Sequence, residues 1–327
     1  MRAVLVEKFG SLDDIRLGET AKPPVKPGHV LVAVKAVGIG FVDVLGALGR
    51  YQVKQELPFV PGGELAGVVE AVGEGVGDIH PGDRVIGGGF AGAWAEYVLC
   101  PAAAVRRMPE NMSFEQGAMF RTNYATALHG LRDRGQVAPG ETLLVLGAAG
   151  GTGTAALQVG KILGARVIAA ASTAEKRAAA LQLGADEAVD YTDPAWREAL
   201  KALTNGKGID VVFDPVGGAT TEQAFRSLAW KGRHLVVGYA SGTIPALPIN
   251  LALLKGASLV GVDVARFGNM HEPAKAQANL QELFDWFAAG KLSFAPGKVI
   301  PFDEIRQAIT DVDGRRSIGK IVARIGA

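Results

Sequence analysis

The segment Leu143-Leu144-Val145-Leu146-Gly147-Ala148-Ala149-Gly150-Gly151-Thr152-Gly153 decides how the second half of this 327-residue chain folds. Four apolar residues precede a glycine-rich turn, and an alanine-rich stretch from about 154 to 163 follows it. This order predicts a buried strand, a tight turn and a helix. Glycines let the backbone approach a diphosphate closely, and a helix N-terminus offers unpaired N–H groups. We therefore expect a dinucleotide diphosphate to bind at Ala149, Gly150, Gly151, Thr152 and Gly153.

The context around this turn supports a dinucleotide site. A strand precedes the turn, a helix follows it, and a second apolar strand ends near Ala171. The spacing G-x-x-G-x-x-G nevertheless differs from the more usual G-x-G-x-x-G. The alternative is that these glycines serve only close packing of the helix on the strand.

The end of the second strand indicates which dinucleotide binds. Enzymes that prefer NADH carry an acidic residue there, which binds the ribose 2′-hydroxyl. This chain has Ser172, with Lys176 and Arg177 shortly after it, so a 2′-phosphate could be bound by charge-assisted hydrogen bonds. We predict NADPH as the cofactor. Two alternatives stay open: both cations lie on a solvated helix face, or Glu175 replaces the missing acid.

Composition limits the partners. The chain has 34 basic and 33 acidic residues and no basic run, so nucleic acid is not an expected partner. The long uncharged stretch 142–160 is rich in glycine and threonine and does not resemble a membrane span. No export signal is visible before Glu7, so we expect a cytoplasmic protein without a membrane partner. The single cysteine, Cys100, excludes an internal disulfide and a multi-cysteine zinc site.

Two domains are predicted from the chain length and from the order of strand-like and helix-like segments. Short β-like runs divided by Gly and Pro turns occupy the first 120 residues and favour a β-barrel or sandwich. Strands then alternate with helices, which predicts a doubly wound parallel sheet. We expect an α/β protein with a first domain of residues 1–122, completed by 265–327, and a cofactor domain of residues 123–264. The expected strands are 30–37, 65–72, 94–99, 143–146, 167–171, 209–213, 235–237, 298–301 and 320–325.

Motifs along almost the whole chain resemble the medium-chain dehydrogenase/reductase superfamily. They are Gly38-Ile39-Gly40-Phe41-Val42-Asp43, Pro61-Gly62-Gly63-Glu64-Leu65-Ala66-Gly67-Val68-Val69, Gly82-Asp83-Arg84-Val85, Asn123-Tyr124-Ala125-Thr126-Ala127, Asp214-Pro215-Val216-Gly217-Gly218 and Gly319-Lys320. Within the superfamily, the chain is most similar to the zinc-independent quinone oxidoreductases related to zeta-crystallin. The resemblance implies a GroES-like substrate domain, a Rossmann domain, a reaction in the cleft between them, and a homodimer joined near residues 258–262.

The resemblance also implies roles for individual residues. The 2′-phosphate site maps to Ser172, Lys176 and Tyr191. Thr126 matches a position at the nicotinamide carboxamide. The loops around the ribose and nicotinamide map to Val216, Gly238, Tyr239 and Ala240, and Phe41 and Lys320 fall near the cofactor by the same mapping.

No metal site is expected. Where related zinc alcohol dehydrogenases carry a metal-binding Cys and His, this chain has Gly40 or its neighbours and Gly63. Its histidines are scattered and predicted to be surface or capping residues: His29, His80, His129, His234 and His271. The chain also lacks the Asn and Tyr that quinone oxidoreductases often carry at the positions of Gly40 and Leu45.

Without a metal to polarise an alcohol, hydride transfer to an electron-poor acceptor is the expected chemistry, and a quinone is the leading substrate. By resemblance to enoyl-thioester reductases, Tyr51 is the candidate proton donor, unless it only caps a core. Asp43 and Asn123 would orient the cleft, with structural hydrogen bonding the alternative for each. The rival functions are reduction of an activated alkene, such as an enal, 2-haloacrylate or enoyl-CoA, and non-catalytic NADPH binding.

Overall fold

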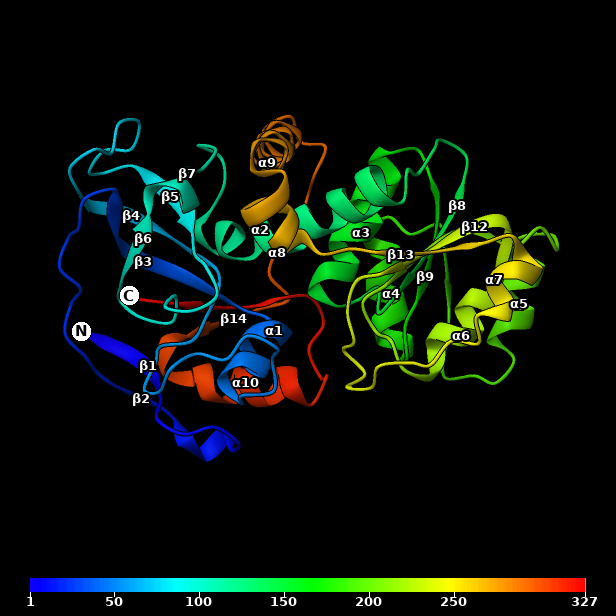
Figure 1. Cartoon of the computed structure of the whole chain (residues 1–327), viewed down its shortest axis with the longest axis horizontal. Coiled ribbons are helices and arrows are strands. Elements are labelled where there is room, and N and C mark those ends of the chain that lie inside the picture. The colour runs from blue at the N-terminus through cyan, green and yellow to red at the C-terminus, as the bar shows by residue number, and fades with distance from the viewer. Residues whose placement is uncertain (327) are drawn as a thin grey trace. The chain divides into compact units, whose positions relative to one another are not determined.

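The apolar run that starts at Val30 forms strand β3 (His29–Ile39) in the computed structural model, which describes residues 1–326. The chain divides into two units. Unit 1 is built from residues 1–121 and the segment from Ser293 onward, and unit 2 from Thr122–Leu292. Both chain termini belong to unit 1 (Figure 1).

Unit 1 is dominated by β-structure. The long strand β3 pairs antiparallel with β4 (Leu65–Val72), β6 (Tyr97–Pro101) and β15 (Ile321–Arg324). Around them the sheet runs in the order β14-β15-β3-β4-β5-β7. The remaining elements of unit 1 are β1 (Arg2–Val6), β2 (Ile15–Glu19), β5 (Arg84–Gly87), β7 (Arg106–Arg107), β14 (Lys298–Pro301), α1 (Phe41–Ala47) and α10 (Ile305–Asp313), with short 3₁₀ turns at Leu12–Asp14, Ala102–Ala104 and Phe302–Glu304.

Trp94 explains one glycine motif of this unit. Its ring is fully buried, and its Nε1–H donates to the Gly38 carbonyl at 3.1 Å. Gly62 has a φ of +97°, and a Cβ there would lie 2.3 Å from the indole ring. Only glycine fits, because the conformation and the ring contact both exclude a side chain. The chain thus bends tightly just before Gly63 and Glu64.

Unit 2 contains the predicted parallel sheet, in the order β10-β9-β8-β11-β12-β13. All its strand pairs are parallel. The strands are β8 (Thr142–Leu146), β9 (Arg166–Ala170), β10 (Glu187–Val189), β11 (Ile209–Asp214), β12 (Leu228–Val236) and β13 (Ser258–Gly261). The prediction of a doubly wound sheet is therefore confirmed.

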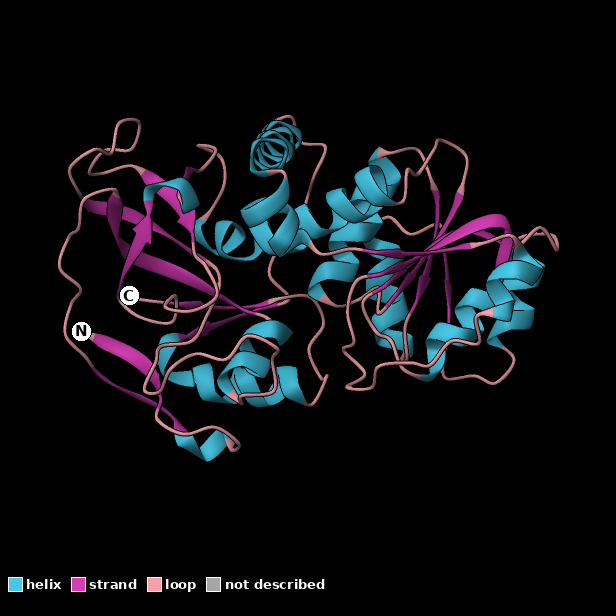
Figure 2. Ribbon diagram, viewed as in Figure 1, coloured by secondary structure: helices cyan, strands magenta, loops and turns pink. Residues whose placement is uncertain are grey.

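Helices cover both faces of this sheet (Figure 2). The helices that contact its strands are α3 (Gly151–Ile162), α4 (Ala174–Gln182), α5 (Trp196–Leu203), α6 (Ala219–Arg226) and α7 (Asn250–Lys255). Unit 2 also contains α8 (Val264–Arg266) and α9 (Pro273–Ala288). Successive strand residues point to opposite faces. Leu144 and Ile168 pack in one cluster with Trp196 of α5, Phe225 of α6 and Leu251 of α7. Their neighbours Leu143 and Val167 lie against Gly160 of α3 on the other face.

Helix α2 (Phe114–Leu128) starts in unit 1, ends in unit 2 and continues as a π-helical turn, His129–Arg134. A second π-helical turn, Phe267–His271, precedes α9. The predicted domain division assigned residues 265–292 to the first domain, whereas the structure places them in unit 2.

A buried polar network explains that difference. Asn279 of α9 donates to Asp133 at 2.8 Å and accepts from Arg132 at 2.6 Å. The His129 ring stacks on Phe267 with centroids 3.8 Å apart. These contacts join α9 and the turn before it to the π-helical turn after α2. Its partners lie more than 130 positions apart in the sequence, so the network has no local signature.

Among the helices that the structure describes between residues 1 and 326, none combines the length and the apolar composition that a membrane span requires.

Candidate functional site

The glycine turn lies where the sequence predicts it, between β8 and α3. Gly147 adopts a φ of +59°, and Gly150 is the N-cap of α3. A Cβ on Gly153 would lie 2.2 Å from the Gly147 carbonyl oxygen, so the helix can pack this closely only because residue 153 has no side chain. The N-cap residue, Gly150, has no side chain that could cap this helix. Its first N–H groups and its positive dipole end are therefore available to an anion.

Asn123 lies against the same turn. It is buried on α2, and its Oδ1 accepts from the Thr152 hydroxyl at 3.3 Å. A Cβ on Gly151 would lie 3.0 Å from the Asn123 Nδ2. The predicted catalytic residue Asn123 thus lines the glycine turn. Thr126, one helical turn later, is also buried and donates its hydroxyl to the Thr122 carbonyl at 2.6 Å.

The other predicted cofactor residues of unit 2 follow the carboxyl ends of neighbouring strands. Ser172 comes after β9, Tyr191 after β10, Val216 after β11 and Gly238 after β12. The carboxyl ends of parallel strands meet at one edge of a sheet, and ligands bind where the strand order reverses. That point lies between β8 and β11, since the chain runs outward from β8 to β10 and resumes at β11 on the other side.

Direct contacts confirm how close the central loops are. A Cβ on Gly147 would lie 2.9 Å from a methyl group of Val216. The loop after β12 bonds to the loop after β11: Ala240 N–H donates to the Pro215 carbonyl at 3.0 Å, and Ser241 N–H to the Val216 carbonyl at 2.7 Å. The structure therefore brings Val216 and the segment Gly238-Tyr239-Ala240 together beside the glycine turn.

Asp214 fixes the loop that carries Val216. Its carboxylate accepts from Val216 N–H at 2.9 Å, Gly217 N–H at 2.8 Å and the Thr221 hydroxyl at 2.7 Å. The His234 Nε2 lies 3.0 Å from the same carboxylate. Burial alone would raise the pKa of Asp214, but the hydrogen bonds and the charge of its partners outweigh burial and lower the pKa below its ordinary value. The carboxylate is therefore held ionised.

Two histidines differ from their predicted surface or capping roles. His234 is fully buried beside Asp214, and His129 is 5% exposed, with its Nδ1 3.1 Å from Asp133. Each supports a loop or helix of unit 2. Sequence reasoning missed both because a histidine in an apolar strand or helix does not reveal the carboxylate that faces it.

At the ends of β9 and β10, Arg177, one of the two cations considered for the 2′-phosphate site, already has hydrogen-bond partners. Thr173 caps α4 by accepting from the Lys176 N–H at 3.2 Å. The Arg177 guanidinium donates to the Ala171 carbonyl at 3.2 Å and to Asp190 at 2.6 Å. The charge of Arg177 is therefore already balanced by Asp190 and is not free to bind an anion. Its side chain also does not lie on a solvated helix face, the alternative considered above.

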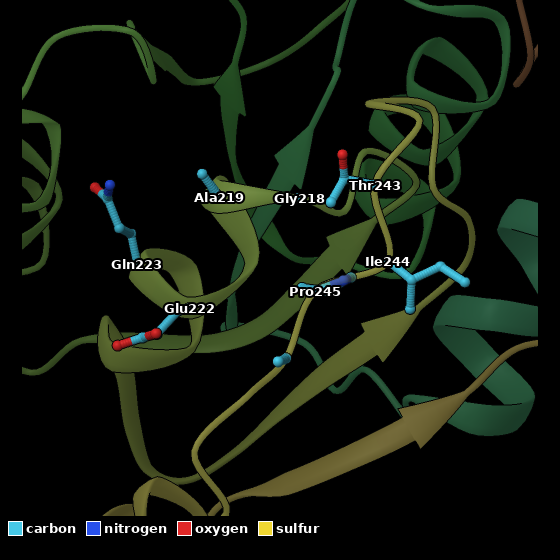
Figure 3. A pocket seen from close by; sticks show the side chains of 8 residues that line it. Gly218, Ala219, Glu222, Gln223, Thr243, Ile244 and Pro245 are labelled. Atoms are coloured by element: carbon cyan, nitrogen blue, oxygen red, sulfur yellow. The ribbon is translucent and has the colours of Figure 1, made fainter.

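The start of α6 borders an open hollow with a volume of about 480 Å³ (Figure 3). Its lining includes Gly218, Ala219 and Glu222 at the start of α6, and Thr243 and Ile244 of the loop after β12. Because Gly218 closes the turn after β11, the hollow lies at the same edge of the sheet as the predicted cofactor residues. Sequence reasoning did not single it out.

Unit 1 contains a buried charge cluster of Asp43, Glu64 and Lys320. The Asp43 carboxylate accepts from Gly40 N–H and Gly63 N–H, each at 2.8 Å. The Lys320 ammonium lies 2.8 Å from Glu64, and both side chains are almost inaccessible, at 6% and 4% exposure. Burial would lower the pKa of Lys320, but Glu64 and Asp43 outweigh burial and raise it. Burial raises the pKa of Asp43, against the opposing charge of Lys320.

This cluster fills the space around Gly40 and Gly63. A Cβ on Gly40 would lie 2.7 Å from the Lys320 Nζ, and one on Gly63 would lie 3.1 Å from Asp43. Residues 1–326 contain no group of three or more His, Cys, Asp and Glu side chains that could hold a metal ion. The Cys100 thiol is buried, and burial raises its pKa to about 11, so it is not a nucleophile at neutral pH.

The remaining predicted residues of unit 1 lie near this cluster in the chain. Phe41 is the first residue of α1 and packs partly buried on the unit 1 core. Tyr51 follows α1 in a loop, is partly buried, and donates its backbone N–H to the Leu45 carbonyl at 3.2 Å.

Each of the two units contains a segment that matches a known protein family. The zinc-binding dehydrogenase family matches residues 151–286, and the alcohol dehydrogenase GroES-like domain matches residues 26–110. The chain is 39% identical to the cattle (Bos taurus) quinone oxidoreductase-like protein 2, over 93% of this chain and 87% of that protein.

Solved structures show the same arrangement of elements. An Escherichia coli quinone oxidoreductase complexed with NADPH has a TM-score of 0.92 and 28% identity over 99% of this chain and all of that chain. The CurK enoyl reductase has a TM-score of 0.90 and 27% identity over 99% of both chains. The predicted fold, a GroES-like domain with a Rossmann-like parallel sheet, is confirmed.

Proposed function

Since the chain belongs to the medium-chain dehydrogenase/reductase superfamily, in its zinc-independent quinone oxidoreductase-like family, we propose that it is an NADPH-dependent oxidoreductase that reduces a quinone. The observation that carries the proposal is the glycine N-cap of α3 at the point where the strand order reverses. A dinucleotide diphosphate fits there, because the glycines leave the helix N–H groups accessible.

Each predicted residue has a task in this proposal. Ala149 to Gly153 bind the diphosphate, with Asn123 supporting the turn. Ser172, Lys176 and Tyr191 bind the 2′-phosphate, which selects NADPH. The ribose and nicotinamide are surrounded by Thr126, Val216, Phe41 and the segment 238–240. Lys320 is different: because its ammonium is paired with Glu64, we assign it a stabilising role in unit 1 in place of a cofactor contact.

Bound NADPH supplies a hydride to an electron-poor acceptor. A quinone fits this chemistry, because its conjugated oxygen delocalises the incoming charge and needs only a hydrogen-bond donor. We assign that donor role to Tyr51. Asp43 holds the backbone of Gly40 and Gly63 in place and so orients the surrounding loops.

Turnover measurements test the substrate. Quenching of protein fluorescence on NADPH titration should show binding, and absorbance at the reduced nicotinamide band should fall when a quinone is added. Faster oxidation by enals or enoyl thioesters than by any quinone would favour an alkene reductase, to which the likeness to an enoyl reductase gives support. Tight binding without oxidation by either class would favour a non-catalytic NADPH-binding protein.

A Lys176→Ala variant tests the 2′-phosphate site. The KM for NADPH should rise about 10-fold and that for NADH less than about 2-fold, because only NADPH carries the phosphate that the ammonium binds. Lys201→Ala, which removes an exposed cation from α5 of the same unit, is the control and should change neither constant. Equal effects of Lys176→Ala on both cofactors would contradict the assignment.

We also propose a homodimer through β13. This strand ends the sheet, so one of its sides is unpaired, and the surface beside it is apolar. Large apolar side chains are exposed there: Trp230 (70%), Ile249 (87%), Leu253 (80%), Leu254 (69%) and Leu259 (53%). A second copy that pairs with this edge would bury these side chains and continue the sheet.

A Leu259→Asp variant should shift the protein from dimer to monomer in sedimentation velocity at micromolar concentration. The introduced carboxylate would be buried against its symmetry mate, which opposes association. Leu181→Asp, on exposed α4 next to the opposite edge strand, should leave the sedimentation coefficient unchanged. A monomeric wild-type chain, or a dimeric Leu259→Asp variant, would contradict this interface.

A further inference from the structure

One side chain joins the carboxyl ends of β9 and β10. The Arg177 Nη1 donates to the Ala171 carbonyl at 3.2 Å and to the Asp190 carboxylate at 2.6 Å. Ala171 immediately precedes Ser172, and Asp190 immediately precedes Tyr191. A single guanidinium therefore connects the residues before two of the three proposed 2′-phosphate ligands.

We call the hydrogen bonds of Arg177 to Ala171 and Asp190 the bracket. Asp190 is also held by a second set of hydrogen bonds. The other carboxylate oxygen of Asp190 accepts from the Thr192 N–H at 2.9 Å and from the Thr192 hydroxyl at 2.6 Å. Tyr191 thus stands between two residues that are bonded to each other. Across the strands, the Ala171 N–H donates to the Val189 carbonyl at 3.1 Å. These hydrogen bonds fix the loop after β9 and the loop after β10, which carry two of the proposed 2′-phosphate ligands.

Charge shows what Arg177 does not do. Its guanidinium is paired at short distance with one carboxylate, and the two side chains are only 24% and 30% exposed. The pair contributes no net charge, so Arg177 itself adds little attraction for a phosphate dianion at this edge. Arg177 acts on a ligand through the positions of Ser172 and Tyr191.

We infer that Arg177 and Asp190 are positioning residues that determine the preference for NADPH over NADH. The inference rests on the proposed cofactor site. Hydrogen bonds to a phosphate need ligands placed within a fraction of an ångström, and a displacement of about 1 Å is costly. Breaking the bracket lets the two loops separate, which weakens contacts to the 2′-phosphate and leaves those to the remainder of the dinucleotide.

The chain offers a matched control. Arg166 and Glu187 form an ion pair at 2.7 Å with 37% and 30% exposure. They are the first residues of β9 and β10, so this pair joins the same two strands at their amino ends. It has the same charge and similar exposure as the bracket, but it lies at the edge of the sheet away from the proposed site.

The test is a double-mutant cycle with dissociation constants from fluorescence titration. Arg177→Met, Asp190→Asn and the double variant should each bind NADPH about 10-fold more weakly and NADH less than about 2-fold more weakly, with the double variant no worse than the single variants. Arg166→Met and Glu187→Gln should leave the NADPH to NADH ratio unchanged. Urea unfolding of each variant checks the fold, and Thr192→Val, which removes only one donor to Asp190, should show a smaller loss of the same preference.

The outcomes separate direct binding from positioning. If Arg177→Met weakens NADPH binding while Asp190→Asn leaves it unchanged or tighter, the guanidinium binds the phosphate itself and the inference is wrong. Unchanged ratios in all the bracket variants also overturn it. If the wild-type chain binds neither dinucleotide, or if Lys176→Ala in the same assay has no effect on the ratio, the proposed cofactor site fails.

Discussion

A Gly153→Ala variant is expected to bind NADPH about 100-fold more weakly than the wild-type chain, or worse, and to lose about 3 kcal/mol of unfolding free energy. The added methyl group would lie 2.2 Å from the Gly147 carbonyl oxygen and 2.8 Å from the Ala148 Cα. Both are backbone atoms, so no side-chain rotation relieves the clash. The start of α3 must move away from β8, and its N–H groups move with it.

A graded series makes this expectation specific. Gly151→Ala places its methyl group 3.0 Å from the Asn123 amide, a side chain that can shift, so its effect on NADPH affinity should be about 10-fold or less. Gly77→Ala meets no atom within 4 Å and has no left-handed φ, so it serves as the control. Dissociation constants come from fluorescence titration and stabilities from urea unfolding. Wild-type affinity in a folded Gly153→Ala variant would show that the diphosphate does not bind at this turn.

The turn could be predicted because its evidence is local. An apolar strand, closely spaced glycines and an alanine-rich helix follow one another within about twenty residues, and each has its own pattern. The expected helix started near Thr154, whereas α3 begins at Gly151. Glycine disfavours helix by itself, so the glycines predicted a later start. The packing against β8 that stabilises the first turn of α3 cannot be seen in the sequence pattern. The parallel sheet followed from the alternation of strands and helices.

The features that could not be predicted depend on partners distant in the sequence. Lys320 meets Glu64 across 256 positions, and Asn279 meets Asp133 across 146. The first contact is the reason for the stabilising role that we propose for Lys320, and the second joins residues 265–292 to unit 2. Arg177 is a nearer case: its partner Asp190 lies only 13 positions away, but the contact requires β9 and β10 to be neighbours.

The Lys320→Met variant is expected to lose about 3–5 kcal/mol of unfolding free energy, because it leaves Glu64 and Asp43 buried without their cation. Combining it with Glu64→Gln should recover much of the loss, since the second change removes one of the uncompensated charges. Urea unfolding at pH 7 measures both. Lys8→Met, which removes an exposed lysine of the same unit, is the control and should be close to neutral. Losses that simply add in the double variant would contradict a coupled pair.

The pH dependence has a definite sign. Glu64 and Asp43 raise the pKa of Lys320 in the folded chain, against the opposing effect of burial. The stabilisation is therefore fully present below the ordinary lysine pKa of about 10.4 and is lost as the pH rises through the higher folded value. The stability difference between wild type and Lys320→Met should stay constant from pH 7 to about pH 10 and shrink only above it. A difference that declines already between pH 7 and pH 9 would mean that the ammonium is not held by these carboxylates.

Cofactor binding distinguishes the two roles considered for Lys320. If the ammonium only balances charge inside unit 1, the double variant Lys320→Met/Glu64→Gln should bind NADPH within about 2-fold of wild type, because it removes no cofactor contact and largely restores stability. If Lys320 instead contacts the cofactor, affinity should fall about 10-fold or more in the double variant even though its stability is largely restored. Measuring unfolding and NADPH affinity on the same samples therefore decides between a stabilising ion pair and a cofactor ligand.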